Sequence, residues 1–262
     1  MRLTKGKKTP AYVKAELEEK SSNRSFKPKD IVTQRDLDSS SIKLTDTQET
    51  LQKVIERNIL TIIQGPPGTA KTLSACYAAL KSLAEGKTEK VIITKAIVES
   101  GERMGFLPGS ISEKIEPYLE SFYKTMAKLV DSYVLDQLKA NNIIEFKPIA
   151  YMRGATYDNS FIILDESQNC DIQSLMLVTT RIGNNSKLLI CGDVSQYDIK
   201  RGDVKLMEFT EMLAPLKDVG VFEFKACDIM RSKFLISVAE QYELYKDKLY
   251  SQKKTAEAKR NG

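Results

Sequence analysis

The sequence predicts an α/β protein with a mostly parallel β-sheet that is covered by helices on both faces. Three observations support this fold class. Short, wholly apolar segments of strand length recur along the chain, as expected of strands that are buried on both faces. Segments with helical periodicity separate them, which is the alternation that produces a parallel sheet. Several of the apolar segments end in polar residues, and such ends lie along one edge of a parallel sheet.

The first 40 residues are polar, charged and only weakly periodic. We expect a basic N-terminal arm over residues 1–40 that is extended or partly disordered, with a short helix at residues 11–20. Thr45 or Asp46 is a suitable N-cap for the helix that follows, whose apolar residues repeat at helical spacing as far as Ile55. This helix leads into the first strand.

Strands and helices then alternate along the chain. The predicted strands are residues 59–63, 91–94, 143–146, 161–165, 187–191 and 219–224. The predicted helices are residues 73–80, one or two helices within 112–140, and residues 171–181, 204–213 and 232–244. We interpret 112–140 as an insertion between core strands and 232–244 as a closing amphipathic helix. The glycine-rich segment 95–109 is assigned no regular structure.

The first strand runs into a Gly/Pro-rich turn that ends in Lys71-Thr72 and opens onto a helix. This layout is typical of a phosphate-binding P-loop, in which backbone N–H groups and the helix N-terminus surround a phosphate. Lys71 is expected to contact the β- and γ-phosphates and the Thr72 hydroxyl to hold Mg²⁺. The predicted nucleotide-binding residues are Gln48, Gly65, Pro66, Pro67, Gly68, Thr69, Ala70, Lys71, Thr72 and Leu73. The alternative is a turn between strand and helix that binds nothing.

Ala70 departs from the usual P-loop pattern, which has glycine immediately before the lysine. Because alanine adds one methyl group and tolerates a helical conformation, we expect a tighter fit and not an inactive site.

A second apolar strand ends in two carboxylates, Asp165 and Glu166. Asp165 is expected to join the Mg²⁺ shell, and Glu166 to orient or deprotonate the water that attacks the γ-phosphate. At a third strand end, Gln196 is a candidate for sensing the γ-phosphate. Arg231 lies where a guanidinium could stabilise transferred charge, although a lone arginine is more often a structural ion-pair partner. Gln48 is a candidate for reading the adenine edge.

Composition excludes several classes of protein. The chain contains no histidine, which removes His-based general bases and most zinc sites. No apolar run approaches the ~20 residues that span a bilayer, so no membrane association is expected. The four cysteines are isolated and are interpreted as buried thiols of a cytoplasmic protein. Residues 1–35 hold ten Lys/Arg against four Asp/Glu, and residues 246–262 hold six against two. Such basic ends favour contact with nucleic acid or serve only for solubility.

Several segments together resemble the PhoH-like family of P-loop ATPases, which is related to superfamily 1 helicases. They are residues 65–72 (GPPGTAKT), 98–109, 113–118, 149–154 (IAYMRG), 164–169 (LDESQN), 180–183 and 192–196 (GDVSQ). The resemblance covers residues 44–245 and implies a single RecA-like P-loop NTPase core at 41–245, with a basic C-terminal tail at 246–262. By this resemblance Gln48 falls in the adenine-contacting motif, Gln196 in the γ-phosphate-linked motif, and Arg231 in the place of an arginine finger.

The resemblance further implies binding of ATP and Mg²⁺, hydrolysis of ATP, a role linked to RNA or single-stranded DNA, and a homo-oligomer in which a ring or hexamer is expected. Lys95 stands where an arginine is more usual. The first 40 residues are too short for the nuclease-like domain of larger relatives, so RNA cleavage is not expected. The catalytic candidates are Lys71, Glu166, Gln196 and Arg231. Two alternatives stay open: an ATP-gated nucleic-acid-binding module with negligible turnover, and a structural assembly protein that retains an inherited P-loop.

Overall fold

A six-stranded parallel sheet forms the centre of the molecule in the computed structural model, which describes residues 27–96, 111–193, 205–230 and parts of 234–245. The strands are β1 (Leu60–Gln64), β2 (Lys90–Lys95), β3 (Ile144–Phe146), β4 (Ser160–Asp165), β5 (Lys187–Gly192) and β6 (Val219–Glu223). Their order across the sheet is β3-β2-β4-β5-β1-β6, and every pairing is parallel. All the strand ends that carry polar residues therefore lie along one edge, as predicted.

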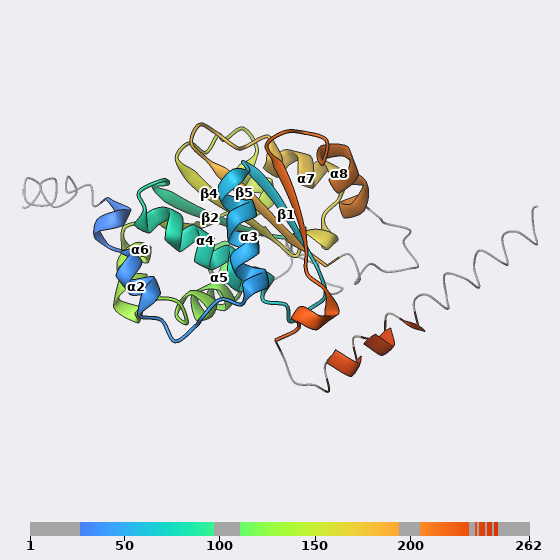
Figure 1. Cartoon of the computed structure of the whole chain (residues 1–262). Helices are drawn as coiled ribbons and strands as arrows, with labels where there is room; N and C mark the ends of the chain where they lie inside the picture. Colours follow the sequence, from blue (N-terminus) through green and yellow to red (C-terminus); the bar gives the residue numbers. More distant parts are fainter. Residues whose placement is uncertain are drawn as a thin grey trace, which may run out of the picture.

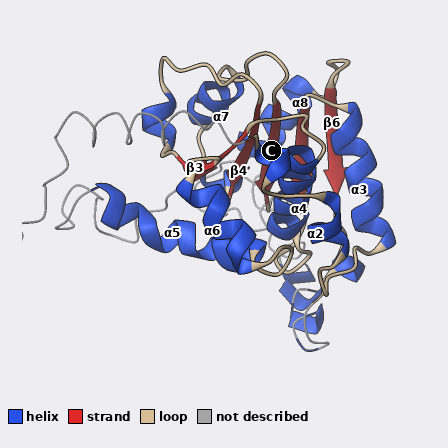
Figure 2. Cartoon of the chain, turned by 90° about the vertical axis from the view of Figure 1, so that its left-hand side faces the viewer, coloured by secondary structure: helices blue, strands red, loops and turns tan. Residues whose placement is uncertain are grey.

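Two helices precede β1, and the others lie between strands, so that helices cover both faces of the sheet (Figure 1). They are α2 (Gln34–Asp38), α3 (Asp46–Arg57), α4 (Lys71–Ala84), α5 (Ile111–Met126), α6 (Ser132–Ala140), α7 (Ile172–Thr179) and α8 (Lys205–Leu213). Figure 2 shows α5 and α6, the predicted insertion, beside α4 and in front of the β3 side of the sheet. Helix α3 begins after the N-cap Thr45, whose side chain accepts from the Gln48 N–H, as predicted.

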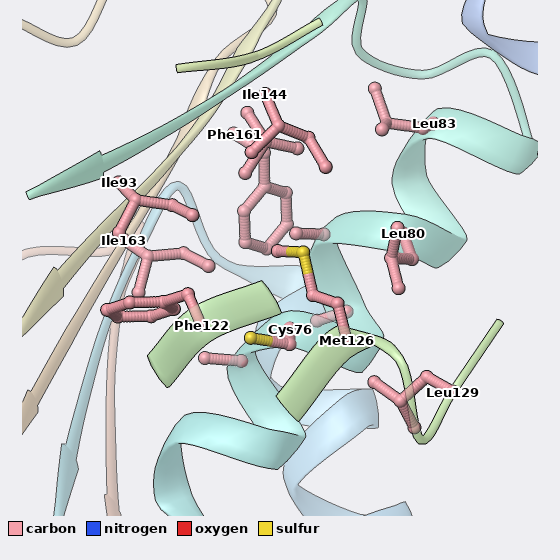
Figure 3. Close-up of a cluster of buried hydrophobic side chains, with 14 of the residues drawn as sticks. Cys76, Leu80, Leu83, Ile93, Phe122, Met126, Leu129, Ile144, Phe161 and Ile163 are labelled. Atoms are coloured by element: carbon pink, nitrogen blue, oxygen red, sulfur yellow. The ribbon is translucent and has the colours of Figure 1, made fainter. Parts of the chain in front are cut away.

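Two apolar clusters lie on opposite faces of the sheet because successive strand residues point to opposite sides. Ile63 and Ile163 belong to the cluster under α3, α4, α5 and α6, whereas their neighbours Ile62 and Ile162 belong to the cluster under α7 and α8. In Figure 3 the α5 residues Phe122 and Met126 contribute to the first cluster together with α4 and the strands. The insertion is therefore part of the core that supports α4. This architecture confirms the predicted α/β fold class, a parallel sheet with helices on both faces.

Residues 28–38, in the C-terminal part of the predicted N-terminal arm, are folded. A 3-10 helix, η1 (Pro28–Asp30), and α2 lie in this segment, and Val32 and Leu37 are buried in the cluster around α4. Ile31 also packs against this cluster, so a few apolar side chains attach the segment to the core although they produce no visible periodicity. The predicted helix at residues 11–20 lies outside the described residues.

Two further expectations need correction. Cys76, Cys170 and Cys191 are buried, but Cys227 is exposed because it lies in a 3-10 turn, η6 (Ala226–Asp228), after the edge strand β6. The described residues between 234 and 245 are helical, as predicted, yet Phe234 is 74% exposed. The periodic pattern indicates a helix but not the surface that its apolar face meets.

In the part of the chain that is described, no helix has both the length and the hydropathy needed to cross a bilayer.

Candidate functional site

The P-loop connects β1 to α4 at the carboxyl edge of the sheet, where the sequence predicts it. Gly65 has φ 149°, and a Cβ added there would lie 2.7 Å from the Cβ of Phe224. Glycine is therefore required where the loop passes the chain that leaves β6. The Thr69 hydroxyl donates to the Pro66 carbonyl oxygen at 2.9 Å and closes the turn. Thr69 is buried, and Pro67 is exposed at the tip.

Ala70 adopts the left-handed conformation, with φ 62° and ψ 32°, immediately before the first residue of α4. From the sequence we relied on the tolerance of alanine for a helical conformation and did not anticipate the left-handed one, and the tighter fit stays a prediction. The left-handed region brings Cβ close to the following carbonyl and disfavours every residue except glycine, with Asn and Asp as partial exceptions. The glycine usual at this position thus has a steric reason. The backbone of this chain adopts the loop conformation in spite of the extra methyl group.

Lys71 directs its ammonium group back onto the loop. Its Nζ donates to the carbonyl oxygens of Gly65 at 2.6 Å and Pro66 at 2.9 Å. Burial lowers the pKa of Lys71, and the negative charge of Asp193 is the largest of the neighbouring charges that oppose this shift. A partly buried cation that donates to neutral carbonyls is well placed to donate to phosphate oxygens in their place.

The Thr72 hydroxyl meets Asp165 across the gap between α4 and β4. Its Oγ1 lies 3.3 Å from Oδ1 and 3.2 Å from Oδ2 of the carboxylate. Burial, and then the charge of Glu166, raises the pKa of Asp165 to about 6. A hydroxyl beside a buried carboxylate fits Mg²⁺, which takes oxygen ligands and usually only one or two from the protein. The donor set is thus compatible with the predicted metal, which would also stabilise the ionised carboxylate.

Glu166, like Ala70, is a residue other than glycine in the left-handed conformation, with φ 54° and ψ 37°. Its Oε1 lies 3.7 Å from the Nζ of Lys95, at the end of β2. Its Oε2 accepts from the Nε2 of Gln168 at 2.7 Å. The Gln168 Oε1 in turn accepts from the backbone N–H of Asp193 at 3.0 Å. The carboxylate is therefore linked to the ends of both strands that flank β4, directly to β2 and through Gln168 to β5.

Among the described residues with a side chain and positive φ, three are asparagines, namely Asn142, Asn159 and Asn185. Asparagine tolerates this region, so these turns need no further explanation. The remaining two are Ala70 and Glu166. Such strain concentrates at functional sites.

Gln48 lies close to the P-loop through Met230. Its Oε1 accepts from the Thr45 N–H in the capping box of α3, and its Nε2 lies 3.2 Å from the Met230 sulfur. The backbone N–H of Met230 donates to the Gly68 carbonyl at 3.0 Å. Because a thioether is a weak acceptor, the Nε2 group can exchange it for a better one, such as a base nitrogen. Leu73 is partly buried and packs its side chain against the core.

The structure brings together Gln48, the P-loop residues 65–72, Asp165 and Glu166. Gln196 and Arg231 lie outside the described residues. Asp193 and Met230, which precede them in the sequence, lie at this site. Sequence reasoning missed the contacts of Gln168, Asp193 and Met230. Gln168 and Asp193 occur within segments that carry the family resemblance, but no local pattern indicates that their groups meet across 25 residues of sequence.

The family model and the relatives found by comparison with known proteins all belong to one family. A family model described as "PhoH-like protein" matches residues 42–243. The PhoH-like protein of Bacillus subtilis (strain 168) is 38% identical over 191 residues, which cover 72% of this chain and 60% of that protein. The PhoH-like protein of Mycobacterium leprae (strain TN) is 34% identical over 204 residues, with coverages of 78% and 58%. The chain thus spans little more than half the length of these relatives.

Among solved structures, the large terminase from a thermophilic bacteriophage, in complex with ADP, has a TM-score of 0.45 at 12% identity. It is matched over 77% of this chain and 50% of its own. The SWI2/SNF2 ATPase core of Sulfolobus solfataricus, in complex with dsDNA, has a TM-score of 0.42 at 11% identity, over 71% of this chain and 45% of its own.

Proposed function

This chain belongs to the PhoH-like protein family, and on that basis we propose that it is a Mg²⁺-dependent ATPase whose hydrolysis is coupled to RNA or single-stranded DNA. One observation carries the proposal. The Thr72 hydroxyl of the P-loop helix lies 3.2 and 3.3 Å from the two oxygens of Asp165, a residue 93 positions away. A phosphate cradle and a carboxylate pair in contact are the two parts that phosphoryl transfer requires.

In the proposed site the P-loop binds the triphosphate. Lys71 leaves the carbonyls of Gly65 and Pro66 and donates to the β- and γ-phosphate oxygens. Thr72 and Asp165 hold Mg²⁺, which supplies charge compensation for the phosphates. Gln48 contacts adenine through the Nε2 group that now meets the Met230 sulfur.

Glu166 acts on the attacking water. The water oxygen forms a bond to the γ-phosphorus, while its proton passes to the Glu166 carboxylate. The bond from the γ-phosphorus to the bridging oxygen breaks, and ADP and inorganic phosphate leave. Glu166 is suited to this role because its side chain is partly exposed and held by Lys95 and Gln168. Gln196 senses the γ-phosphate, and Arg231 stabilises the transferred charge, from a neighbouring subunit if a ring forms.

Nucleic-acid coupling rests on charge and on an exposed aromatic residue. The excess of positive charge is six in residues 1–35 (ten against four) and four in residues 246–262 (six against two). Tyr151, in the 3-10 helix η3 (Ile149–Met152) that follows β3, is 61% exposed, and Arg153 beside it is also exposed. Basic and aromatic side chains together bind single strands without sequence preference.

The test is release of phosphate from ATP with Mg²⁺ at low salt, measured alone and with single-stranded RNA, single-stranded DNA or duplex. We expect basal hydrolysis that a single strand stimulates. Hydrolysis without stimulation by any nucleic acid would remove the coupling. ATP binding without hydrolysis would favour the alternative, an ATP-gated nucleic-acid-binding module. For either function we propose a cytoplasmic location.

The proposed oligomer has its own measurement. If Arg231 completes a neighbour's site, the rate per subunit rises as protein concentration passes through the range of assembly. A rate per subunit that stays constant through assembly would contradict a shared site.

A further inference from the structure

The Gln168 side chain connects Glu166 to the end of β5. It lies in the 3-10 helix η4 (Ser167–Asn169), directly after Glu166. Both ends of its amide are used: Nε2 donates to Glu166 Oε2 at 2.7 Å, and Oε1 accepts from the Asp193 N–H at 3.0 Å. The side chain is therefore oriented by a backbone group and in turn orients a carboxylate.

The backbone group that orients Gln168 is itself firmly placed. Asp193 follows β5 directly and is buried. The end of β5 packs closely on η4, since a Cβ added to Gly192 would collide with the hydroxyl of Ser167 and lie 2.5 Å from Cδ2 of Leu206. The amide is thus held between two closely packed segments, and Glu166 receives a donor in a defined position.

Lys95 contacts the same carboxylate from the other side. Its Nζ lies 3.7 Å from Glu166 Oε1, a longer contact than the 2.7 Å hydrogen bond from Gln168. A hydrogen bond to a carboxylate is stronger and more directional than a partly exposed ion pair at this distance. Gln168 therefore determines the orientation of the carboxylate plane, whereas Lys95 adds positive charge.

Orientation matters because a general base must present a lone pair to the water it deprotonates. A glutamate side chain has three rotatable bonds, and a group that reduces this freedom lowers the entropic part of the barrier. An amide suits the task because it has no proton to exchange near neutral pH. Gln168 can hold Glu166 without competing for the transferred proton.

We propose that Gln168 is a positioning residue for Glu166, which ties the carboxylate to the end of β5 through the Asp193 N–H. The proposal rests on the proposed ATPase function. It makes the orientation of Glu166 depend on the position of β5, the strand from which the chain continues to Gln196.

The test compares kcat and KM for ATP in Gln168→Met, Gln168→Glu and Glu166→Gln. Gln168→Met keeps the length of the side chain and removes both hydrogen bonds. Gln168→Glu keeps an acceptor for the Asp193 N–H but has no donor for Glu166. We expect kcat to fall about 10- to 100-fold in both variants, the effect of a misplaced catalytic group. KM should change by no more than about threefold, because ATP contacts other residues.

The double variant Gln168→Met with Glu166→Gln separates positioning from a general structural effect. If Gln168 acts through Glu166, adding Gln168→Met to Glu166→Gln lowers kcat no further. The matched control is Gln34→Met in α2, which removes an exposed glutamine–carboxylate hydrogen bond of 2.8 Å to Asp38, a residue with no part in the proposed site. It should leave kcat unchanged. Thermal unfolding of all variants shows whether each is folded, and Gln168→Glu serves if Gln168→Met is not.

Wild-type kcat in Gln168→Met, or a rise in KM alone, would overturn the positioning role. An equal further loss in the double variant would also overturn it, since Gln168 would then act independently of Glu166. A wild-type chain that does not hydrolyse ATP overturns the proposed function and the positioning role together. These outcomes distinguish failure of the inference from failure of the function.

Discussion

The P-loop and the turn after β4 each contain a residue other than glycine whose backbone is in the left-handed conformation. Only one of the two has a side chain that makes polar contacts. Ala70 and Glu166 have φ values of 62° and 54°. The Glu166 carboxylate contacts Lys95 and Gln168, whereas the Ala70 methyl has no group to direct at a partner. The left-handed backbone thus directs a carboxylate toward its partners at Glu166. At Ala70 it only allows the P-loop to reach α4.

Glu166→Gln tests the region where strain and function coincide, and we expect the largest effect there. Glutamine has nearly the same size but cannot take the proton of the attacking water. The loss of a general base lowers kcat by about 10²- to 10⁴-fold. Binding of ATP, measured by titration, should change little, because the P-loop contacts are retained.

Glu145→Gln is the matched control for this variant. Glu145 is also a carboxylate held by basic groups, Lys90 at 2.6 Å and Lys147 at 3.0 Å, but it lies on β3. Its replacement should leave kcat at the wild-type value. Turnover by Glu166→Gln equal to that of wild type would remove Glu166 from the mechanism and favour the binding module.

Asp165→Asn tests the contact through which the two regions meet. The pKa of Asp165 is raised from 3.8 to about 6 by burial and by Glu166, so the folded state holds the proton more tightly than the unfolded state. The ionised form is therefore unfavourable in the folded protein above pH 6, by up to about 3 kcal/mol. Asparagine does not ionise. Without nucleotide or metal, Asp165→Asn should increase the free energy of unfolding at pH 8.

The pH dependence gives this prediction its sign. Well below the unfolded pKa of 3.8, at about pH 3, Asp165 is largely protonated in both states, so the advantage of the variant should disappear there. With ATP and Mg²⁺ the order should reverse, because only the wild-type chain offers the carboxylate to the metal. Asp136→Asn is the control, since Asp136 is exposed on α6 and should show neither effect. An advantage that persists undiminished at about pH 3 would show that charge burial is not its cause.

Much of this edge could be predicted from sequence because its signals are local. The apolar run before Asp165 and the Gly/Pro turn before Lys71 each identify a strand and its ending within about ten residues. The contacts of Gln168 could not be predicted, because its partner Asp193 lies 25 residues away and the pairing depends on how closely β5 packs on η4. The left-handed Ala70 was missed for a related reason. Alanine is a good helix former, and the path of the loop overrides that propensity.

Ala70→Gly tests the region where strain serves no side chain, and it has the smallest expected effect. Relief of the left-handed conformation favours glycine by about 1–2 kcal/mol. The greater freedom of glycine in the unfolded chain opposes this by about 0.4–1 kcal/mol. The net result is a modest stabilisation that raises the Tm by about 2–4 °C for each 1 kcal/mol. Asn142→Gly, at φ 52° in the turn between α6 and β3, is the comparison, and it should gain less because asparagine tolerates this region. A destabilised Ala70→Gly would mean that the methyl group is used after all, and the contrast with Glu166 would not stand.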